Sequence, residues 1–219
     1  KADAYGHGAV RIAQRCLLAG ASWLAVAIPE EGVELREAGV KSPILILGGI
    51  DPSQAELIFQ YNLQPCVFSY DMLDILNQHG MKFNKKIGVH LKVDTGMGRI
   101  GLRSEEEILR FCSCIEEMKF IYLEGIFTHF AAADDPDSSY TLLQMKRFNR
   151  VIAYLKDFNI NPSWIHAANS AAILRYPDVQ FNLVRAGISM YGYYPSEQIK
   201  TSVQLEPILE WKTRVVFVK

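Results

Sequence analysis

The stretch KIGVHLKVDT, residues 86–95, decides the fold prediction, because it has the composition of a buried β-strand and ends in polar residues. Other short runs share this character, and several are almost continuously apolar, which is typical of parallel strands buried on both faces. These runs are residues 23–28, 43–49, 64–69, 122–130, 164–169 and 182–192. The sequence therefore predicts seven strands.

Segments with helical periodicity alternate with these runs. The clearest spans residues 137–159, and residues 29–39 begin with proline and two acids and end with glycine, as helix ends prefer. Residues 104–118 are expected to start on a capping box formed by Ser104 and Glu107. Strands that alternate with helices along the whole chain predict an α/β fold with a parallel sheet.

Two parallel architectures fit this pattern, an open doubly wound sheet and a closed (β/α)8 barrel of the TIM type. We favour the barrel because polar candidates follow several predicted strands, and such barrels carry catalytic groups at the carboxyl ends of their strands. An eighth strand would have to precede Lys1, so we expect the printed sequence to lack the first strand. We expect the barrel domain to span residues 1–196, and residues 197–219 to begin a connection to a further domain.

Composition and charge exclude several classes of function. The 219 residues are 49% hydrophobic and 21% charged, which suits a soluble globular protein with a large core. A net charge of -1 offers no basic field for nucleic acid. No stretch approaches the roughly 18 apolar residues that span a bilayer. We therefore expect a small-molecule partner, no nucleic acid and no membrane.

The four cysteines are not spaced as metal ligands. They are Cys16, Cys66, Cys112 and Cys114, and they show neither a C-x-x-C pair nor histidines at zinc spacing. We expect no metal, and reduced thiols of this kind are typical of the cytoplasm.

The first residue, Lys1, precedes a glycine-bracketed turn that contains Tyr5. A lysine at a strand end can form a Schiff base with a carbonyl cofactor when desolvation lowers its pKa. The Tyr5 hydroxyl could then reach a phosphate of that cofactor. Most lysines are solvated surface groups, so an ordinary surface lysine is the competing interpretation.

A second candidate is Arg185, which is flanked by apolar residues on a predicted strand. A buried guanidinium needs partners, so Arg185 forms either a structural ion pair or a ligand contact. The backbone N–H groups of Gly187 and Ile188 suit a phosphate. Asn169 and Ser170, at the start of a predicted helix, suit the same phosphate. TIM barrels commonly bind phosphate after their last two strands, which agrees with this placement.

A third candidate site lies at the end of the strand predicted at residues 86–95. Lys92 and Asp94 are two residues apart and would share one side of the pleat, with Arg99 close behind. Such alternating charges also fit a half-exposed strand. The glycines of residues 96–101 do not match the spacing of a phosphate loop or of a dinucleotide fingerprint.

Five motifs resemble the alanine racemase family in order and spacing: KADAYGHGA, LKVDTGMGRIG, THFAAAD, HAANSAA and VRAGISMYG. The resemblance implies a pyridoxal 5'-phosphate enzyme with a (β/α)8 barrel and a mostly β C-terminal domain. It implies a cytoplasmic homodimer whose active site is shared between subunits. Such an enzyme interconverts L-alanine and D-alanine and supplies D-alanine for bacterial peptidoglycan. The printed sequence would then end before the β domain, in which the partner subunit's tyrosine serves as the second base.

The resemblance also assigns roles to individual residues. It implies that Lys1 holds the cofactor covalently and acts as one base. Arg185 would lie at the pyridine nitrogen with His129 as its neighbour, and Arg99 near the cofactor's phenolic oxygen and the substrate carboxylate. Lys92 matches a lysine that several members carry as a carbamate, and an ordinary lysine paired with Asp94 is the competing interpretation. The implied phosphate contacts are Tyr5, Ser170, Gly187 and Ile188.

Three other functions remain open at this point. A serine racemase of the same family would share these motifs. A single-domain pyridoxal-phosphate-binding protein would share the barrel. The run VVFVK, residues 215–219, leads out of the predicted barrel and favours a two-domain enzyme. A decarboxylase of this plan would carry an acid in place of Arg185 at the ring nitrogen.

Overall fold

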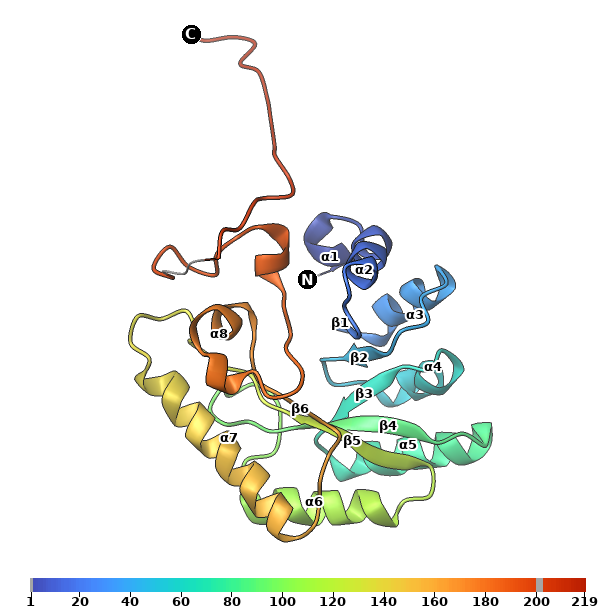
Figure 1. Ribbon diagram of the computed structural model, residues 1–219. Coiled ribbons are helices and arrows are strands. Elements are labelled where there is room, and N and C mark those ends of the chain that lie inside the picture. The colour runs from blue at the N-terminus through green and yellow to red at the C-terminus, as the bar shows by residue number, and fades with distance from the viewer. Residues whose placement is uncertain (1, 200–202) are drawn as a thin grey trace.

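Parallel strands in chain order form the sheet of this protein (Figure 1), whose computed structural model describes residues 2–199 and 203–219. Each strand pairs with the strand next in sequence. The strands of the described part are β1 (Leu24–Val26), β2 (Ile44–Ile46), β3 (Gln64–Val67), β4 (Ile87–Lys92), β5 (Ile121–Phe127) and β6 (Trp164–His166). This curled parallel sheet confirms the predicted α/β class and barrel-type topology.

Helices follow the outer side of the curved sheet (Figure 1). They are α2 (Ala9–Leu18), α3 (Pro29–Glu37), α4 (Ala55–Gln60), α5 (Tyr70–Phe83), α6 (Glu105–Glu117) and α7 (Ser139–Asp157), with α8 (Ser170–Arg175) above β6. Their apolar faces pack on the sheet through fully buried side chains such as Phe59 of α4, Phe111 of α6 and Phe148 of α7. The predicted start of α6 is confirmed, because the Ser104 hydroxyl accepts from the Glu107 N–H at 3.1 Å, which is one of the two hydrogen bonds of the expected capping box.

Strand β4 lies inside the sheet, paired with β3 on one side and β5 on the other. All six of its residues are buried, which explains the nearly continuous apolar pattern of its sequence. Two polar side chains, His90 and Lys92, are buried with it. The strand therefore carries polar groups into the interior of the curved sheet.

The prediction of a strand over residues 182–192 is wrong. A single parallel bridge joins Leu183 to His166, and the Arg185 N–H donates to the carbonyl of Ala168 at 2.9 Å. At Gly187 the backbone turns, with φ -133° and ψ -105°, into the 3-10 helix η3 (Ile188–Tyr191). The segment has a neighbour on one side only in the described part of the chain, so it lacks a second ladder to hold it extended.

Residues 203–219 form neither helix nor strand and run away from the sheet (Figure 1). The expected extended connection thus carries no sheet pairing within the described residues. Trp211 and Phe217 are exposed on it. The four cysteines are free thiols, as expected, with Cys66 and Cys112 buried. Among the described residues no helix combines the length and apolar character of a membrane span.

Candidate active site

The guanidinium of Arg185 lies among neutral acceptors at the carboxyl ends of β5 and β6. Its Nη1 donates to Nδ1 of His166 at 2.7 Å, and its Nη2 donates to the carbonyls of Thr128 and Ala167 at 2.7 and 3.0 Å. Nδ1 of His129 lies 3.4 Å from Nη2, so the predicted neighbour is present. Within the described residues no carboxylate pairs with Arg185, which removes the structural ion pair as an interpretation. Burial, and then Arg99, lower the pKa of Arg185 to about 9.

His166 was not among the predicted site residues. Because arginine only donates hydrogen bonds, Nδ1 of His166 must accept, and the ring is neutral with its proton on Nε2. Burial, followed by the charge of Arg185, lowers the pKa of His166 well below its ordinary value. The ring of Phe127 stacks on it at 4.7 Å. The sequence did contain one signal for His166: a histidine within a predicted buried strand, next to the polar residues that end this strand.

Lys92 ends β4 as a buried lysine, only 2% exposed, with Nζ 4.4 Å from the centre of the Phe127 ring. Burial, and then the charge of Arg185, lower its pKa to about 7. The competing Lys92–Asp94 pair is not found in the part of the chain described. Asp94 instead pairs with Arg103 at 2.8 Å, because the strand ends at Lys92 and Asp94 belongs to the following loop.

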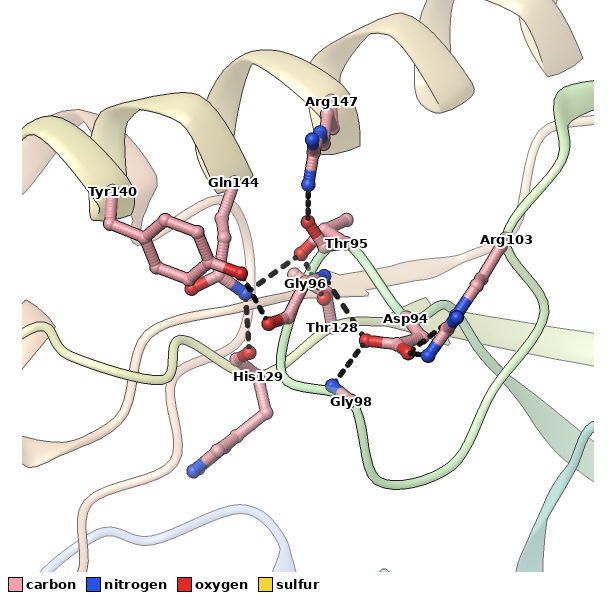
Figure 2. Close-up of polar contacts among 10 residues, drawn as sticks. All are labelled: Asp94, Thr95, Gly96, Gly98, Arg103, Thr128, His129, Tyr140, Gln144 and Arg147. Carbon is pink, nitrogen blue, oxygen red and sulfur yellow. Dashed lines mark hydrogen bonds and ion pairs between the residues drawn. The ribbon is translucent and has the colours of Figure 1, made fainter.

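Arg99 lies exposed on this loop, residues 94–102, whose base is held by Asp94 (Figure 2). The Asp94 carboxylate accepts from the N–H groups of Gly96 and Gly98 at 3.1 and 3.0 Å. Burial alone would raise the pKa of Asp94, but these bonds and the contact with Arg103 together outweigh it and lower the pKa. Asp94 therefore shapes the loop that carries Arg99.

Side chains of helix α7 connect the same loop to the end of β5 through hydrogen bonds (Figure 2). Tyr140 and Arg147 donate to loop carbonyls at 2.6 and 2.8 Å. Gln144 donates to the Thr95 hydroxyl at 3.2 Å and to the carbonyl of His129 at 3.0 Å. The loop of Arg99 and the strand end of His129 are thus fixed to one helix, by residues that sequence reasoning missed.

Small polar groups gather between Tyr5, α8 and η3. The Ser170 hydroxyl accepts from the N–H groups of Gly187 and Ser189 at 2.9 and 3.3 Å. A Cβ on Gly187 would lie 3.3 Å from the Tyr5 hydroxyl and 3.6 Å from that of Ser170, so the absence of a side chain lets both hydroxyls approach this backbone closely. Hydroxyl and backbone N–H donors are the groups that bind phosphate in proteins.

Tyr5 is presented by a left-handed turn, α1 (Asp3–Gly6). Asp3, Ala4 and Tyr5 have φ values of 50°, 52° and 60°, a conformation that costs about 1–2 kcal/mol per residue. The ring of Tyr5 meets the ring of Tyr191 edge-on at 5.0 Å, and burial raises the pKa of the Tyr5 hydroxyl. The turn and the ring contact with Tyr191 hold the Tyr5 hydroxyl close to Gly187.

The remaining predicted residues occupy different positions. Asn169 is the N-cap of α8, with its side-chain oxygen accepting from the Ala172 N–H at 3.0 Å. Ile188 is the first residue of η3, directly after Gly187. Lys1 lies outside the described residues. The structure therefore brings Arg185, His129 and Lys92 to one group of strand ends. It also places the hydroxyls of Tyr5 and Ser170 next to Gly187 as a second group.

The chain matches the family model "Alanine racemase, N-terminal domain" over residues 1–195. It is 46% identical to the alanine racemase of Halothermothrix orenii and 43% identical to that of Symbiobacterium thermophilum. Both matches cover all of this chain and 58% of the relative, so the chain spans less than two thirds of these curated relatives.

Solved structures give the same relationship. The alanine racemase of Clostridium difficile 630 in complex with cycloserine superposes with a TM-score of 0.91 at 37% identity, covering 94% of this chain and 57% of that one. A histidine racemase from Leuconostoc mesenteroides superposes with a TM-score of 0.87 at 28% identity, covering 94% of this chain and 55% of that one. The matched motifs, the sheet topology and these similarities together establish that the chain belongs to the alanine racemase family.

Proposed function

We propose that this chain is the cofactor-binding part of a pyridoxal-phosphate-dependent alanine racemase, which interconverts L-alanine and D-alanine. The observation that carries the proposal is Arg185, held on neutral acceptors at the strand ends with only N–H donors to offer a ligand. Membership of the family supports the reaction. In a bacterial cytoplasm the D-alanine would serve peptidoglycan synthesis.

The donor set of the site fits pyridoxal phosphate. Tyr5, Ser170 and the N–H groups of Gly187 and Ile188 would hold its phosphate, and Arg185 would face its pyridine nitrogen. When bound, the cofactor supplies a conjugated ring that withdraws electrons from the α-carbon of the substrate.

Arg185 determines how strongly that ring withdraws electrons. A guanidinium stays protonated and only donates, so a ring nitrogen beside it accepts a hydrogen bond and gains no proton. An unprotonated ring is the weaker electron acceptor. Arg185 thereby favours rapid return of a proton to the α-carbon over transamination.

Racemisation also needs one acid or base on each face of the α-carbon. We assign one face to Lys1, and the other to a tyrosine of the partner subunit's C-terminal domain, in a homodimer with a shared site. His129 would support Arg185, and Arg99 would attract the substrate carboxylate. This assignment rests on the family motifs.

The test is the racemisation rate of the complete protein, loaded with pyridoxal phosphate, on alanine, serine and histidine. Histidine is included because a histidine racemase is among the similar structures. We expect alanine to turn over fastest. A faster rate with serine or histidine would assign the protein to that substrate, and a bound cofactor without turnover of any amino acid would indicate a binding protein.

Replacing Ser170 with alanine should weaken cofactor binding about tenfold. Its hydroxyl organises the N–H groups of Gly187 and Ser189, and one hydrogen bond to a charged group contributes roughly 1.5–3 kcal/mol. The measurement is the Kd of pyridoxal phosphate from a fluorescence titration. Ser113→Ala, on the exposed face of α6, is the matched control. Equal affinity in both variants would remove Ser170 from the phosphate site.

Lys92 should carry a carbamate. Its pKa of about 7 leaves the amine neutral above that pH, and only the neutral amine attacks carbon dioxide. The Lys92 nitrogen forms a bond to the carbon of carbon dioxide, and one amine proton leaves to solvent. The side chain becomes an anion able to pair with Arg99. The modification should form above about pH 7 and be lost below it, since protonation removes the nucleophile.

The carbamate is detected by ¹³C NMR of the complete protein in ¹³C-labelled bicarbonate. We expect a carbamate signal in the wild type and in Lys146→Gln, an exposed control on α7, and none in Lys92→Gln. High-resolution density for an unmodified amine on Lys92 at alkaline pH would contradict the assignment.

A further inference from the structure

A line of hydrogen-bonded side chains leads from Arg185 across the interior of the sheet. Beyond His166, its Nε2 lies 2.9 Å from Nδ1 of His90. Nε2 of His90 lies 3.2 Å from the side-chain oxygen of Gln64, and the Gln64 amide nitrogen donates to the Glu124 carboxylate at 2.8 Å. The participants come from β6, β4, β3 and β5 in turn. Gln64, His90 and Glu124 have no part in the function proposed above.

Chemistry at the Arg185 end sets the direction of every bond in this line. Nδ1 of His166 accepts from Arg185, so the His166 proton is on Nε2 and is donated to Nδ1 of His90. His90 then carries its own proton on Nε2 and donates it to Gln64. Burial, and then Arg185, lower the pKa of His90 to about 3, which agrees with a neutral ring.

The Glu124 end enforces the same direction independently. An ionised carboxylate only accepts, so the amide nitrogen of Gln64 must face Glu124 and its oxygen must face His90. With the amide reversed, an oxygen would face the carboxylate and an N–H would face the proton of His90. A cation at one end and an anion at the other thus permit one arrangement of the protons between them.

The backbone is adapted to hold Glu124 in this line. Val89 pairs with Leu123 and His90 pairs with Gly125, so Glu124 is the extra residue of a β-bulge between β4 and β5. Bulges redirect side chains and are frequent near active sites.

Two glycines leave room for the line. A Cβ on Gly88 would overlap the Glu124 carboxylate, and a Cβ on Gly125 would overlap the ring of His90. Gly88 and His90 are two residues apart on β4, so they share a face of the sheet. Glu124 lies against Gly88 and Gly125 lies against His90, so both lie on that same interior face.

We propose that Glu124 is a positioning residue for Arg185, acting through Gln64, His90 and His166. The line keeps Nδ1 of His166 free of a proton and therefore available to Arg185. If His166 carried its proton on Nδ1, that N–H would face the guanidinium and release Nη1. The consequence for catalysis rests on the proposed function, whereas the line of fixed protons does not.

The test is ¹⁵N NMR of the histidine side chains in the complete holoenzyme, with signals assigned by single His→Gln variants. In the wild type we expect neutral His90 and His166, both with the proton on Nε2. Glu124→Gln offers a donor and an acceptor at the end of the line, so it should populate both tautomers of His166. Gln64→Leu should do the same by interrupting the line. Racemisation in both variants should fall about tenfold, the order expected for one hydrogen bond to a charged group.

The matched control is Glu56→Gln, an exposed carboxylate paired with Lys82, which should change neither signal nor rate. A wild-type His166 with its proton on Nδ1, or protonated on both nitrogens, would overturn the proposal without any variant having to fold. So would unchanged tautomers in folded Glu124→Gln, or changed tautomers with an unchanged rate. A wild type that does not racemise amino acids but shows these tautomers contradicts only the proposed function.

Discussion

Arg185→Glu is expected to lower the racemisation rate of the complete protein by about a thousandfold. The substitution replaces a donor of several hydrogen bonds by an acceptor that faces the carbonyls of Thr128 and Ala167. Losing one preorganised donor at a reacting group typically costs 10²- to 10³-fold, and the upper end is expected because the new carboxylate also faces carbonyls that the guanidinium held. The glutamate would share a proton with the pyridine nitrogen, so the absorption of the substrate-bound cofactor should shift to longer wavelength as the rate falls.

Two variants make this result interpretable. Arg185→Lys keeps the charge but lacks the planar fork that reaches His166 and two carbonyls, so an intermediate rate is expected. Arg110→Glu makes the same charge change on the exposed face of α6 and should behave as the wild type. If the spectrum of Arg185→Glu with substrate equalled that of the wild type, Arg185 would not be the partner of the ring nitrogen.

Lys1→Ala should reduce racemisation by at least 10²- to 10⁴-fold, the loss typical of a positioned acid or base. The larger value is expected because Lys1 would also be the covalent attachment of the cofactor. In the wild type, borohydride reduction should abolish the absorption of the cofactor–lysine linkage and leave the cofactor on the peptide that contains Lys1. The variant should bind the cofactor without such attachment.

Lys146→Ala is the control for both readouts, since this lysine is exposed on α7. Recovery of the reduced cofactor on any lysine other than Lys1 would contradict the assignment. Substantial racemisation by Lys1→Ala would contradict the two-base reaction even if the label were found where expected.

Most of the sheet could be predicted because its strands are buried on both faces and therefore have apolar sequences, as β4 does. The segment around Leu183 has the same composition and still forms no strand, since pairing depends on a neighbour that local sequence does not report. Burial explains why Arg185 needed partners. Their identity could not be predicted, because backbone carbonyls and His166 come together only when β5 and β6 are adjacent.

The residues of the candidate site also divide into those that the sequence predicts and those that only the fold reveals. Motif positions led to Arg99, His129 and Ser170, which carry polar groups after predicted strands. Helix α7 gave no such signal, although Gln144 fixes both Thr95 and His129. Its residues read as one face of an ordinary amphipathic helix, and only the fold reveals that this face meets the loop after β4.

Because the strands pair in the order in which they are synthesised, the sheet can grow during translation by adding one β-strand and its helix at a time. Each new unit can pair with an edge strand that has already formed. Arg185 follows β6, so its guanidinium emerges from the ribosome later than the side chain of His166, its partner in the folded protein. Assembly of the sheet and maturation of the Arg185 centre are therefore separate events, and ribosome-stalled chains that end before and after residue 185 would resolve them in time.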